Sequence, residues 1–442
     1  MKPTLFAAPL LAAACLAAPA IADPSTFRCS KLDTASALPS IEGKDGVFYR
    51  VLADLRMRHP MEDPVVAQMA ALSDALASGG TTLIYVTVPT KSQAMPDYLP
   101  PEADDYAFDR DTAKLVYQDI VGRLSASGVL APNILSALAG ASPDKPAFFQ
   151  ADFHWTSEGA RLAAAAIAET IKAQPSYADL PKSEYRTVEL EKTAAFSTMR
   201  RTLQAFCVDE LPRVEAVAHR TELVASPDED VADIFAGDDE AAQIVLVGTS
   251  FSDSPLGNFA GFLSEYTGLD VVNYAVTGGN QFGGMTSYLT SRDFAENRPR
   301  FLIWENPIYN NLAQFGPDPM DELVAAAGQT CTTKLPVTVS GPNSVSADLA
   351  GLKLGPKDVI FADLGTDGPR EALFTLKSAT GITRNATVQR SDRMLASGRF
   401  FKPLASVWHP DLTELTVTFD RPVSEATTLT LCTSSSTLKD YR

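Results

Sequence analysis

Four short, almost wholly apolar runs alternate with longer segments of helical character between residues 46 and 324. Strands that are apolar on both faces are typical of a parallel sheet covered by helices on both sides. The sequence therefore predicts an α/β unit in which a parallel sheet is sandwiched by helices. The expected strands are 81–88, 244–247, 271–276 and 301–304, and the expected helices are 65–76, 111–125, 158–173 and 259–266.

The pattern changes after Cys331, where short β-like runs are separated by turn residues without a long helical segment. This pattern predicts a small antiparallel β-sandwich or barrel. We expect one domain over 23–330 and a second over 331–442. The stretch 176–239 is irregular, and we expect an elaboration of the first domain that a disulfide ties down. The expected strands of the second domain are 335–339, 358–361, 372–376, 415–419 and 427–431.

Residues 1–22 have the layout of a secretory signal peptide: Lys2, an Ala/Leu-rich run, and then Ala20-Ile21-Ala22. Cleavage there predicts an exported protein whose first residue is Asp23. The apolar run is too short and Ala-rich for a transmembrane anchor, and no other segment is apolar enough to span a bilayer. A lipoprotein anchored through Cys15 is the alternative, although the residues before Cys15 match a lipobox poorly.

Removing the signal peptide leaves four of the five cysteines, an even number in an exported chain. Three pairings are possible. We favour Cys29–Cys207 with Cys331–Cys432, because this pairing ties each half of the chain to itself. No two cysteines lie at a short ligand spacing, so we expect no metal site, and nothing in the sequence indicates a cofactor.

The formal net charge of −17 argues against nucleic acid as a partner. The tail 335–442 differs, with 12 basic and 11 acidic side chains. Within 370–402 seven basic side chains stand against two acidic ones. Such a basic cluster on an acidic protein suggests an anionic ligand, whereas ordinary surface charge is the plainer interpretation. A tryptophan in the same region could stack on a sugar or belong to the core. The candidate ligand contacts are Arg384, Arg390, Arg393, Arg399, Lys402 and Trp408.

Of the four histidines, His154 alone has a carboxylate two positions before it and a helix-start signal after it. If residues 152–154 are extended, Asp152 and His154 point the same way, and the carboxylate can bind one imidazole nitrogen. Ser250 follows an expected strand and enters a turn. These are the parts of a nucleophilic acyl-transfer site. The alternatives are a serine that only caps a helix and an incidental Asp-x-His in a loop.

Gly279 and Asn280 follow the expected strand 271–276. Functional residues in open α/β sheets gather at the carboxyl ends of the strands. We therefore expect Gly279 and Asn280 to contribute N–H donors for an oxyanion, although a simple tight turn would explain them equally well.

In combination these motifs resemble the SGNH-like alginate O-acetyltransferases, the AlgX/AlgJ family. The motifs are Asp-x-His-Trp at 152–155, Gly-Thr-Ser-Phe-Ser at 248–252, Asn258-Phe259, Asn273-Tyr274-Ala275 and Trp304-Glu305. The tail after Cys331 brings the chain nearer to AlgX. The resemblance implies a periplasmic enzyme that transfers acetyl groups to hydroxyls of an acidic exopolysaccharide, with a carbohydrate-binding module at its end. It implies Ser250 as nucleophile, His154 as base and Asp152 as the group that orients the base.

Two departures from ordinary SGNH esterases stand out. The Asp-x-His motif precedes the serine, and Thr249 stands where those esterases carry an aspartate. Two rival functions stay open at this point: an acetylesterase, in which water resolves the acyl-enzyme, and a non-catalytic polysaccharide-binding scaffold of an export complex. Other proteins of such a complex are possible partners. The acetyl donor is not indicated by the sequence.

Overall fold

The computed structural model describes residues 25–224, 242–328 and 331–433. Its centre is a parallel sheet with the strand order β3 (Thr82–Val88), β8 (Phe301–Pro307), β6 (Ile244–Val247) and β7 (Val271–Asn273). Every residue of β6 and β8 is buried, as helices on both faces require. The predicted α/β fold is thus confirmed. β7 is shorter than expected, because the Asn273 side chain accepts from the Ala275 N–H and turns the chain.

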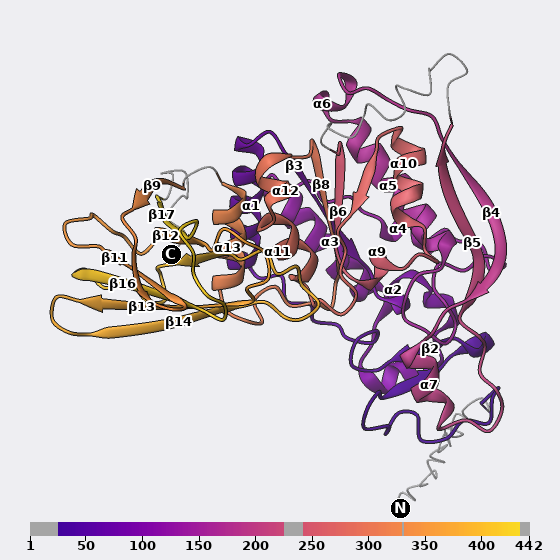
Figure 1. Cartoon of the computed structure of the whole chain (residues 1–442). Helices are drawn as coiled ribbons and strands as arrows, with labels where there is room; N and C mark the ends of the chain where they lie inside the picture. Colours follow the sequence, from indigo (N-terminus) through magenta and orange to yellow (C-terminus); the bar gives the residue numbers. More distant parts are fainter. Residues whose placement is uncertain (1–24, 225–241, 329–330, 434–442) are drawn as a thin grey trace, which may run out of the picture.

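Helices cover both faces of this sheet (Figure 1). On one side α5 (Ser157–Lys172) packs on α10 (Phe259–Thr267), and on the other α1 (Asp63–Ser78) packs on α13 (Asp318–Ala327). The four predicted helices are all present within two residues of their expected ends. The others are α2 (Lys91–Ala94), α3 (Arg110–Ala126), α4 (Leu135–Ala139), α6 (Pro175–Ala178), α7 (Thr198–Gln204), α9 (Ser250–Asp253), α11 (Gly283–Leu289) and α12 (Arg292–Glu296).

The start of α5 is fixed by local chemistry, and this matters because His154 lies just before it. The Thr156 hydroxyl caps the helix by accepting from the Gly159 N–H at 3.2 Å. A side chain at Gly159 would meet the Ala147 carbonyl oxygen at 2.2 Å, so only glycine fits there. The side chain of Trp155, 2% exposed, packs into the core. Residues 152–154 are therefore held at the rim of the sheet.

The description of 176–239 as irregular is wrong. β4 (Tyr185–Ala194) and β5 (Glu215–Leu223) form a long antiparallel ribbon, and α7 lies between them in sequence. The ribbon lies along the outside of α5 and α10 (Figure 1). The acidic run that the sequence shows from 228 to 240 lies outside the described residues.

The N-terminal strands form a separate small sheet, β1 (Ser40–Glu42) with β2 (Phe48–Arg50). The expected disulfide Cys29–Cys207 is present and joins the N-terminal segment to the end of α7. Met199 and Leu203 of α7 pack in a small core with Phe48. The bridge thus ties α7 to the base of the α/β unit.

The tail forms two antiparallel sheets that share a core, which confirms the predicted β-sandwich. Burial alternates along β13, as expected for a strand with one face inward. The run 335–339 is not one strand: β9 and β10 belong to different sheets on either side of Pro336, which has no N–H for a ladder. One sheet has the strand order β10 (Thr338–Gly341), β11 (Ser344–Asp348), β16 (Leu412–Phe419), β13 (Glu371–Ser378) and β14 (Thr383–Gln389). The other has the order β15 (Arg399–Pro403), β12 (Val359–Asp363), β17 (Thr428–Cys432) and β9 (Cys331–Leu335).

The sandwich packs on the α/β unit through β15 and α13. Phe401 and Val359 of the sandwich belong to the hydrophobic core of the larger unit. The second expected disulfide, Cys331–Cys432, closes the sandwich by joining β9 to β17. None of the helices in the three described ranges has the length and apolar character needed to cross a bilayer.

Candidate active site

Ser250 lies at the carboxyl end of β6, where the strand turns into α9. The turn is tight: a side chain at Gly248 would meet a carboxylate oxygen of Glu305 at 2.5 Å. Thr249 caps α9, and its hydroxyl accepts from the Phe251 N–H at 3.3 Å. Ser250 is thereby the first helical residue and is only partly buried. A hydroxyl in this position is accessible to a substrate.

His154 and Asp152 meet Ser250 in a continuous chain of hydrogen bonds. His154 Nε2 lies 2.7 Å from Ser250 Oγ, and His154 Nδ1 lies 2.6 Å from Asp152 Oδ1. Because an ionised carboxylate only accepts, Nδ1 carries the proton and Nε2 is left to accept from the serine hydroxyl. Three side chains from segments 96 residues apart thus come together as nucleophile, base and carboxylate.

The backbone of 152–154 turns and is not extended, so the reason given for the Asp152–His154 pairing is wrong. Asp152 Oδ1 accepts from the backbone N–H of His154 at 2.8 Å as well as from the ring. One carboxylate oxygen therefore fixes both the turn and the imidazole. This is an Asx-type turn, in which the side chain bonds the backbone two residues on.

The second oxygen of Asp152 accepts a hydrogen bond from the Ser197 hydroxyl. The Asp152 side chain is 5% exposed. Burial opposes its ionisation, but the bonds from His154 and Ser197 outweigh burial and lower the pKa of Asp152 to about 2. The carboxylate is therefore charged at any physiological pH. Ser197 was not anticipated from the sequence, because no local pattern links it to Asp152.

The imidazole is also held by aromatic rings. Phe153 and Phe251 lie with ring centroids 4.1 Å and 4.9 Å from that of His154. The Arg50 guanidinium covers the Phe153 ring at 4.3 Å. Trp155 donates from Nε1 to the Phe251 carbonyl at 2.9 Å, which joins the histidine segment directly to α9. These contacts fix the ring orientation that the hydrogen bonds require.

Glu305 lies beneath the Ser250 turn, at the carboxyl end of β8, and is 0% exposed. It accepts from the Thr249 N–H at 2.8 Å and from the Ser252 hydroxyl at 2.9 Å. The sequence places Glu305 directly after an expected strand and in a family motif, but it does not indicate that this side chain contacts the Ser250 turn.

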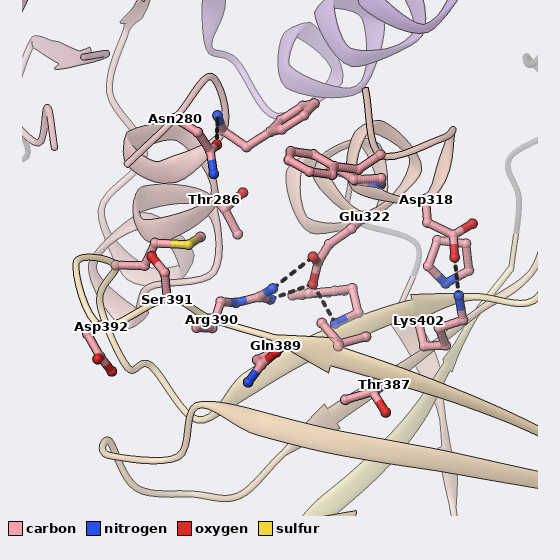
Figure 2. A pocket seen from close by; sticks show the side chains of 17 residues that line it. Asn280, Thr286, Asp318, Glu322, Thr387, Gln389, Arg390, Ser391, Asp392 and Lys402 are labelled. Atoms are coloured by element: carbon pink, nitrogen blue, oxygen red, sulfur yellow. Dashed lines mark hydrogen bonds and ion pairs between the residues drawn. The ribbon is translucent and has the colours of Figure 1, made fainter. Parts of the chain in front are cut away.

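Neither of the two predicted oxyanion donors forms a hydrogen bond with Ser250 in the described part of the chain. The Gly279 N–H already donates to the Val276 carbonyl at 3.0 Å. Asn280 has φ of 58°, and its side-chain oxygen accepts from the Phe282 N–H at 2.8 Å. Figure 2 shows Asn280 at the edge of a cleft between the α/β unit and the sandwich. The Gly279 N–H is therefore engaged within its own loop, and an oxyanion role of Asn280 stays a prediction.

That cleft has a volume of about 700 Å³ and carries two of the predicted basic residues on its wall (Figure 2). Arg390 is 5% exposed and forms a two-pronged ion pair with Glu322 of α13, with one bond of 3.0 Å. Lys402, 3% exposed, pairs with Asp318 at the start of α13. Both cations therefore hold the sandwich against the α/β unit, and their role as ligand contacts stays a prediction.

Arg399 and Trp408 also have structural partners. Arg399 donates to the Ser291 carbonyl and lies 3.5 Å from an Asp363 oxygen. Trp408 packs on the sandwich core, with its N–H 3.4 Å from the Leu354 carbonyl. Trp408 thus packs on the core but is only half-buried, so its stacking on a sugar stays a prediction.

Two of the predicted contacts remain on the surface. Arg384, in β14, and Arg393 are both exposed. Arg393 donates to the Thr277 carbonyl at 3.1 Å, so it bridges the sandwich and the loop that follows β7.

Comparison with known proteins places this geometry in a family. Residues 41–308 match the family model described as "SGNH hydrolase-like domain, acetyltransferase AlgX". The "Alginate biosynthesis protein AlgX" of Azotobacter vinelandii is 34% identical over 298 residues, which are 67% of this chain and 60% of that protein. The "Probable alginate O-acetylase AlgJ" of Pseudomonas fluorescens is 30% identical over 293 residues, 64% of this chain and 72% of that protein.

A solved structure shares the fold. The structure titled "Structural and functional characterization of Pseudomonas aeruginosa AlgX" superposes with a TM-score of 0.74 at 24% identity, covering 95% of this chain and 99% of that one. The sequence match spans about 60% of the length of the Azotobacter vinelandii relative. With more than half of its residues matched by the family model, the chain belongs to the AlgX family of SGNH hydrolase-like domains.

Proposed function

We propose that this protein is an O-acetyltransferase that moves acetyl groups, through an acetyl-serine, onto hydroxyls of an acidic exopolysaccharide. The observation that carries the proposal is the hydrogen-bonded chain Ser250–His154–Asp152. The names of the relatives, an alginate biosynthesis protein and a probable alginate O-acetylase, support alginate as the acceptor.

The proposed chemistry has two balanced half-reactions. In the first, Ser250 Oγ attacks the acetyl carbonyl of a donor ester while its proton passes to His154 Nε2. The ester bond to the leaving oxygen then breaks, and this oxygen takes the proton from His154. In the second, His154 accepts the proton of a sugar hydroxyl, whose oxygen attacks the acetyl-serine. Ser250 leaves as its alkoxide and regains a proton from His154. Asp152 stabilises the imidazolium in both steps.

The acceptor-binding part of the proposal rests on the two basic side chains that remain exposed. Arg384 and Arg393 are available to carboxylates of a uronate chain. Arg393 lies against Thr277, beyond the end of β7, at the junction of the two units. A polymer held there has a raised effective concentration near the α/β unit.

We further propose the division into a signal peptide (1–22), a catalytic domain (23–330) and a carbohydrate-binding module (331–442). Both disulfides support an oxidising compartment, for which the periplasm is our proposal. Partners from a polysaccharide modification and export complex follow from the same proposal.

Mass spectrometry of the purified protein with a chromogenic acetyl ester and defined uronate oligomers tests the function. We expect a mass gain of one acetyl group on Ser250, which disappears when oligomer is added and reappears on the oligomer. Ser250→Ala should form no adduct, whereas Ser254→Ala, which removes a neighbouring hydroxyl, should behave as wild type. Release of acetate without acetylated oligomer would indicate an esterase. No adduct in the wild type, with oligomer still bound, would indicate a scaffold.

A further inference from the structure

Glu305 is a buried carboxylate whose partners all come from the turn that presents Ser250. Its two oxygens face three donors: the Thr249 N–H, the Thr249 hydroxyl and the Ser252 hydroxyl. All three donors reach the same carboxylate oxygen, Oε2, at 2.8, 3.1 and 2.9 Å, and the Thr249 hydroxyl lies equally far from Oε1. The side chain is 0% exposed. Three bonds to residues on both sides of Ser250 make this contact a clamp on the nucleophile turn.

The direction of these hydrogen bonds follows from their surroundings. The Thr249 oxygen already accepts from the Phe251 N–H, so its own proton is free to point at Glu305. The contact leaves no space for a side chain at position 248, because a Cβ there would lie 2.5 Å from a Glu305 oxygen. Ionised glutamate accepts on both oxygens, whereas the neutral acid turns one oxygen into a donor. The charged form is therefore the stronger acceptor for all three donors.

No cation balances this charge among the described residues. The titratable groups that face Glu305 are Tyr85 of β3 and Tyr309 after β8, and burial raises the pKa of both tyrosines. Burial also raises the pKa of Glu305, to about 7, although the bonds from Thr249 and Ser252 oppose the shift. The clamp thus loses its charged form within the pH range in which a histidine base works.

We propose that Glu305 is a positioning residue for the acetyl transfer proposed above, holding Ser250 against His154 through Thr249 and Ser252. The proposal also accounts for Thr249. An aspartate at position 249 would bring a second carboxylate against Glu305, whereas the threonine hydroxyl adds a donor to the one that the backbone N–H supplies. The buried carboxylate at this turn comes from β8 and not from the turn itself.

The test is the pH dependence of acetyl-Ser250 formation from a chromogenic ester. In the wild type the rate should fall as the pH drops below about 7, because Glu305 then loses its charge. In Glu305→Gln this ionisation is gone. We expect a shallower pH profile, with the rate at pH 8 at least about 10-fold lower because the neutral amide is a weaker acceptor for the three donors.

Two further variants keep the test independent of folding. Thr249→Val removes one donor and leaves Glu305 in place, so the rate should fall while the pH profile stays as steep as in the wild type. Asp321→Asn alters a half-buried carboxylate of α13 that bonds to Gln68. It should leave both the rate and the pH profile unchanged. An unaltered profile in folded Glu305→Gln would overturn the proposal and leave the acetyl transfer intact.

A second readout does not depend on activity. The amide resonance of Thr249, which donates directly to Glu305, should titrate near pH 7 in the wild type and in Ser250→Ala, but not in Glu305→Gln. If the wild type forms no acetyl-serine, the proposed function fails while this titration still decides the role of Glu305. An amide shift that is independent of pH overturns the clamp.

Discussion

Ser197 donates a hydrogen bond to Asp152 across 45 residues of sequence, so the carboxylate of the site is held from two sides. The same Ser197 hydroxyl caps α7 by accepting from the Arg200 N–H at 3.0 Å. Its proton is thus directed at Asp152 and its lone pair at the helix. Through this one hydroxyl the position of Asp152 depends on the position of α7.

Ser197→Ala should slow acetyl-Ser250 formation by about 10- to 100-fold, because a hydrogen bond to a charged group contributes about 1.5–3 kcal/mol. Ser197→Thr, which keeps the hydroxyl, should retain most of the rate. The measurement is the single-turnover rate of adduct formation with a chromogenic ester.

Loss of the cap alone could weaken the fold, and Ser291 provides the control. Its hydroxyl caps α12 by accepting from the Phe294 N–H at 3.0 Å. Ser291→Ala should lower the free energy of unfolding by about 1 kcal/mol and leave the rate unchanged. Equal rates for Ser197→Ala and Ser291→Ala would show that Ser197 acts on the helix only.

The sequence predicts the local parts of this site well. Thr156 lies directly before an apolar helical pattern and does cap α5. Ser250 follows a fully apolar strand, and both features are set by a few neighbouring residues. The bond from Ser197 to Asp152 has no such local signal. It depends on how α7 docks, which the Cys29–Cys207 bridge and a small separate core determine.

Two other features of the structure could not be predicted from the sequence, for the same physical reason. The β4–β5 ribbon is largely exposed on both faces, so it shows no clean apolar alternation by which a strand is recognised. The charge of Arg390 is visible in the sequence, but its partner Glu322 lies 68 residues away on another unit. Composition could indicate a basic cluster, whereas only the packing shows that its buried members are already neutralised.

Arg390→Ala should destabilise the protein by about 3–5 kcal/mol, because it leaves the carboxylate of Glu322 buried without its partner. Arg384→Ala, at an exposed site in β14, should change stability by less than about 0.5 kcal/mol. Denaturant unfolding of the two variants gives the comparison. The double variant Arg390→Met with Glu322→Leu should recover much of the loss.

The binding of uronate oligomers should depend on Arg384 and not on Arg390, which is the reverse of their effects on stability. Arg384→Ala should weaken the binding of oligomers and leave stability unchanged. The folded double variant Arg390→Met/Glu322→Leu should bind oligomers as the wild type does. If the double variant lost binding at unchanged stability, the buried pair would have a ligand role after all.

Burial of Glu305 predicts an unusual pH dependence of stability. Its pKa is about 7 in the folded protein against an ordinary value of 4.5, so between these values the folded state binds more protons than the unfolded state. Stability from this group is present below pH 4.5 and is lost as the pH rises to about 7. The shift corresponds to about 3 kcal/mol at most.

Glu305→Gln should remove that dependence. Denaturant unfolding at pH 5 and pH 7.5 is the measurement, and the difference between the two pH values should be smaller in the variant than in the wild type. The sign of the change in stability between the two pH values is the informative result. A wild type that gains stability through Glu305 as the pH rises would show that the ionised form is favoured by the fold.

The two disulfides should differ in their effect on chemistry. Replacing Cys29 and Cys207 by alanine frees the end of α7, whose first turn carries Ser197. We expect a loss of about 2–5 kcal/mol in the free energy of unfolding, together with slower acetyl-Ser250 formation in the protein that remains folded. The rate should fall toward that of Ser197→Ala, since the same bond to Asp152 is loosened.

Replacing Cys331 and Cys432 by alanine opens the sandwich at the ends of β9 and β17. A comparable loss of stability is expected, but the rate of adduct formation should stay at the wild-type value below the unfolding transition, because neither strand contacts the Ser250 turn. Combining Ser197→Ala with the loss of Cys29–Cys207 then separates the causes. Rates that fall no further than in Ser197→Ala alone mean that the bridge acts through Ser197, whereas multiplied effects mean that it acts by another route.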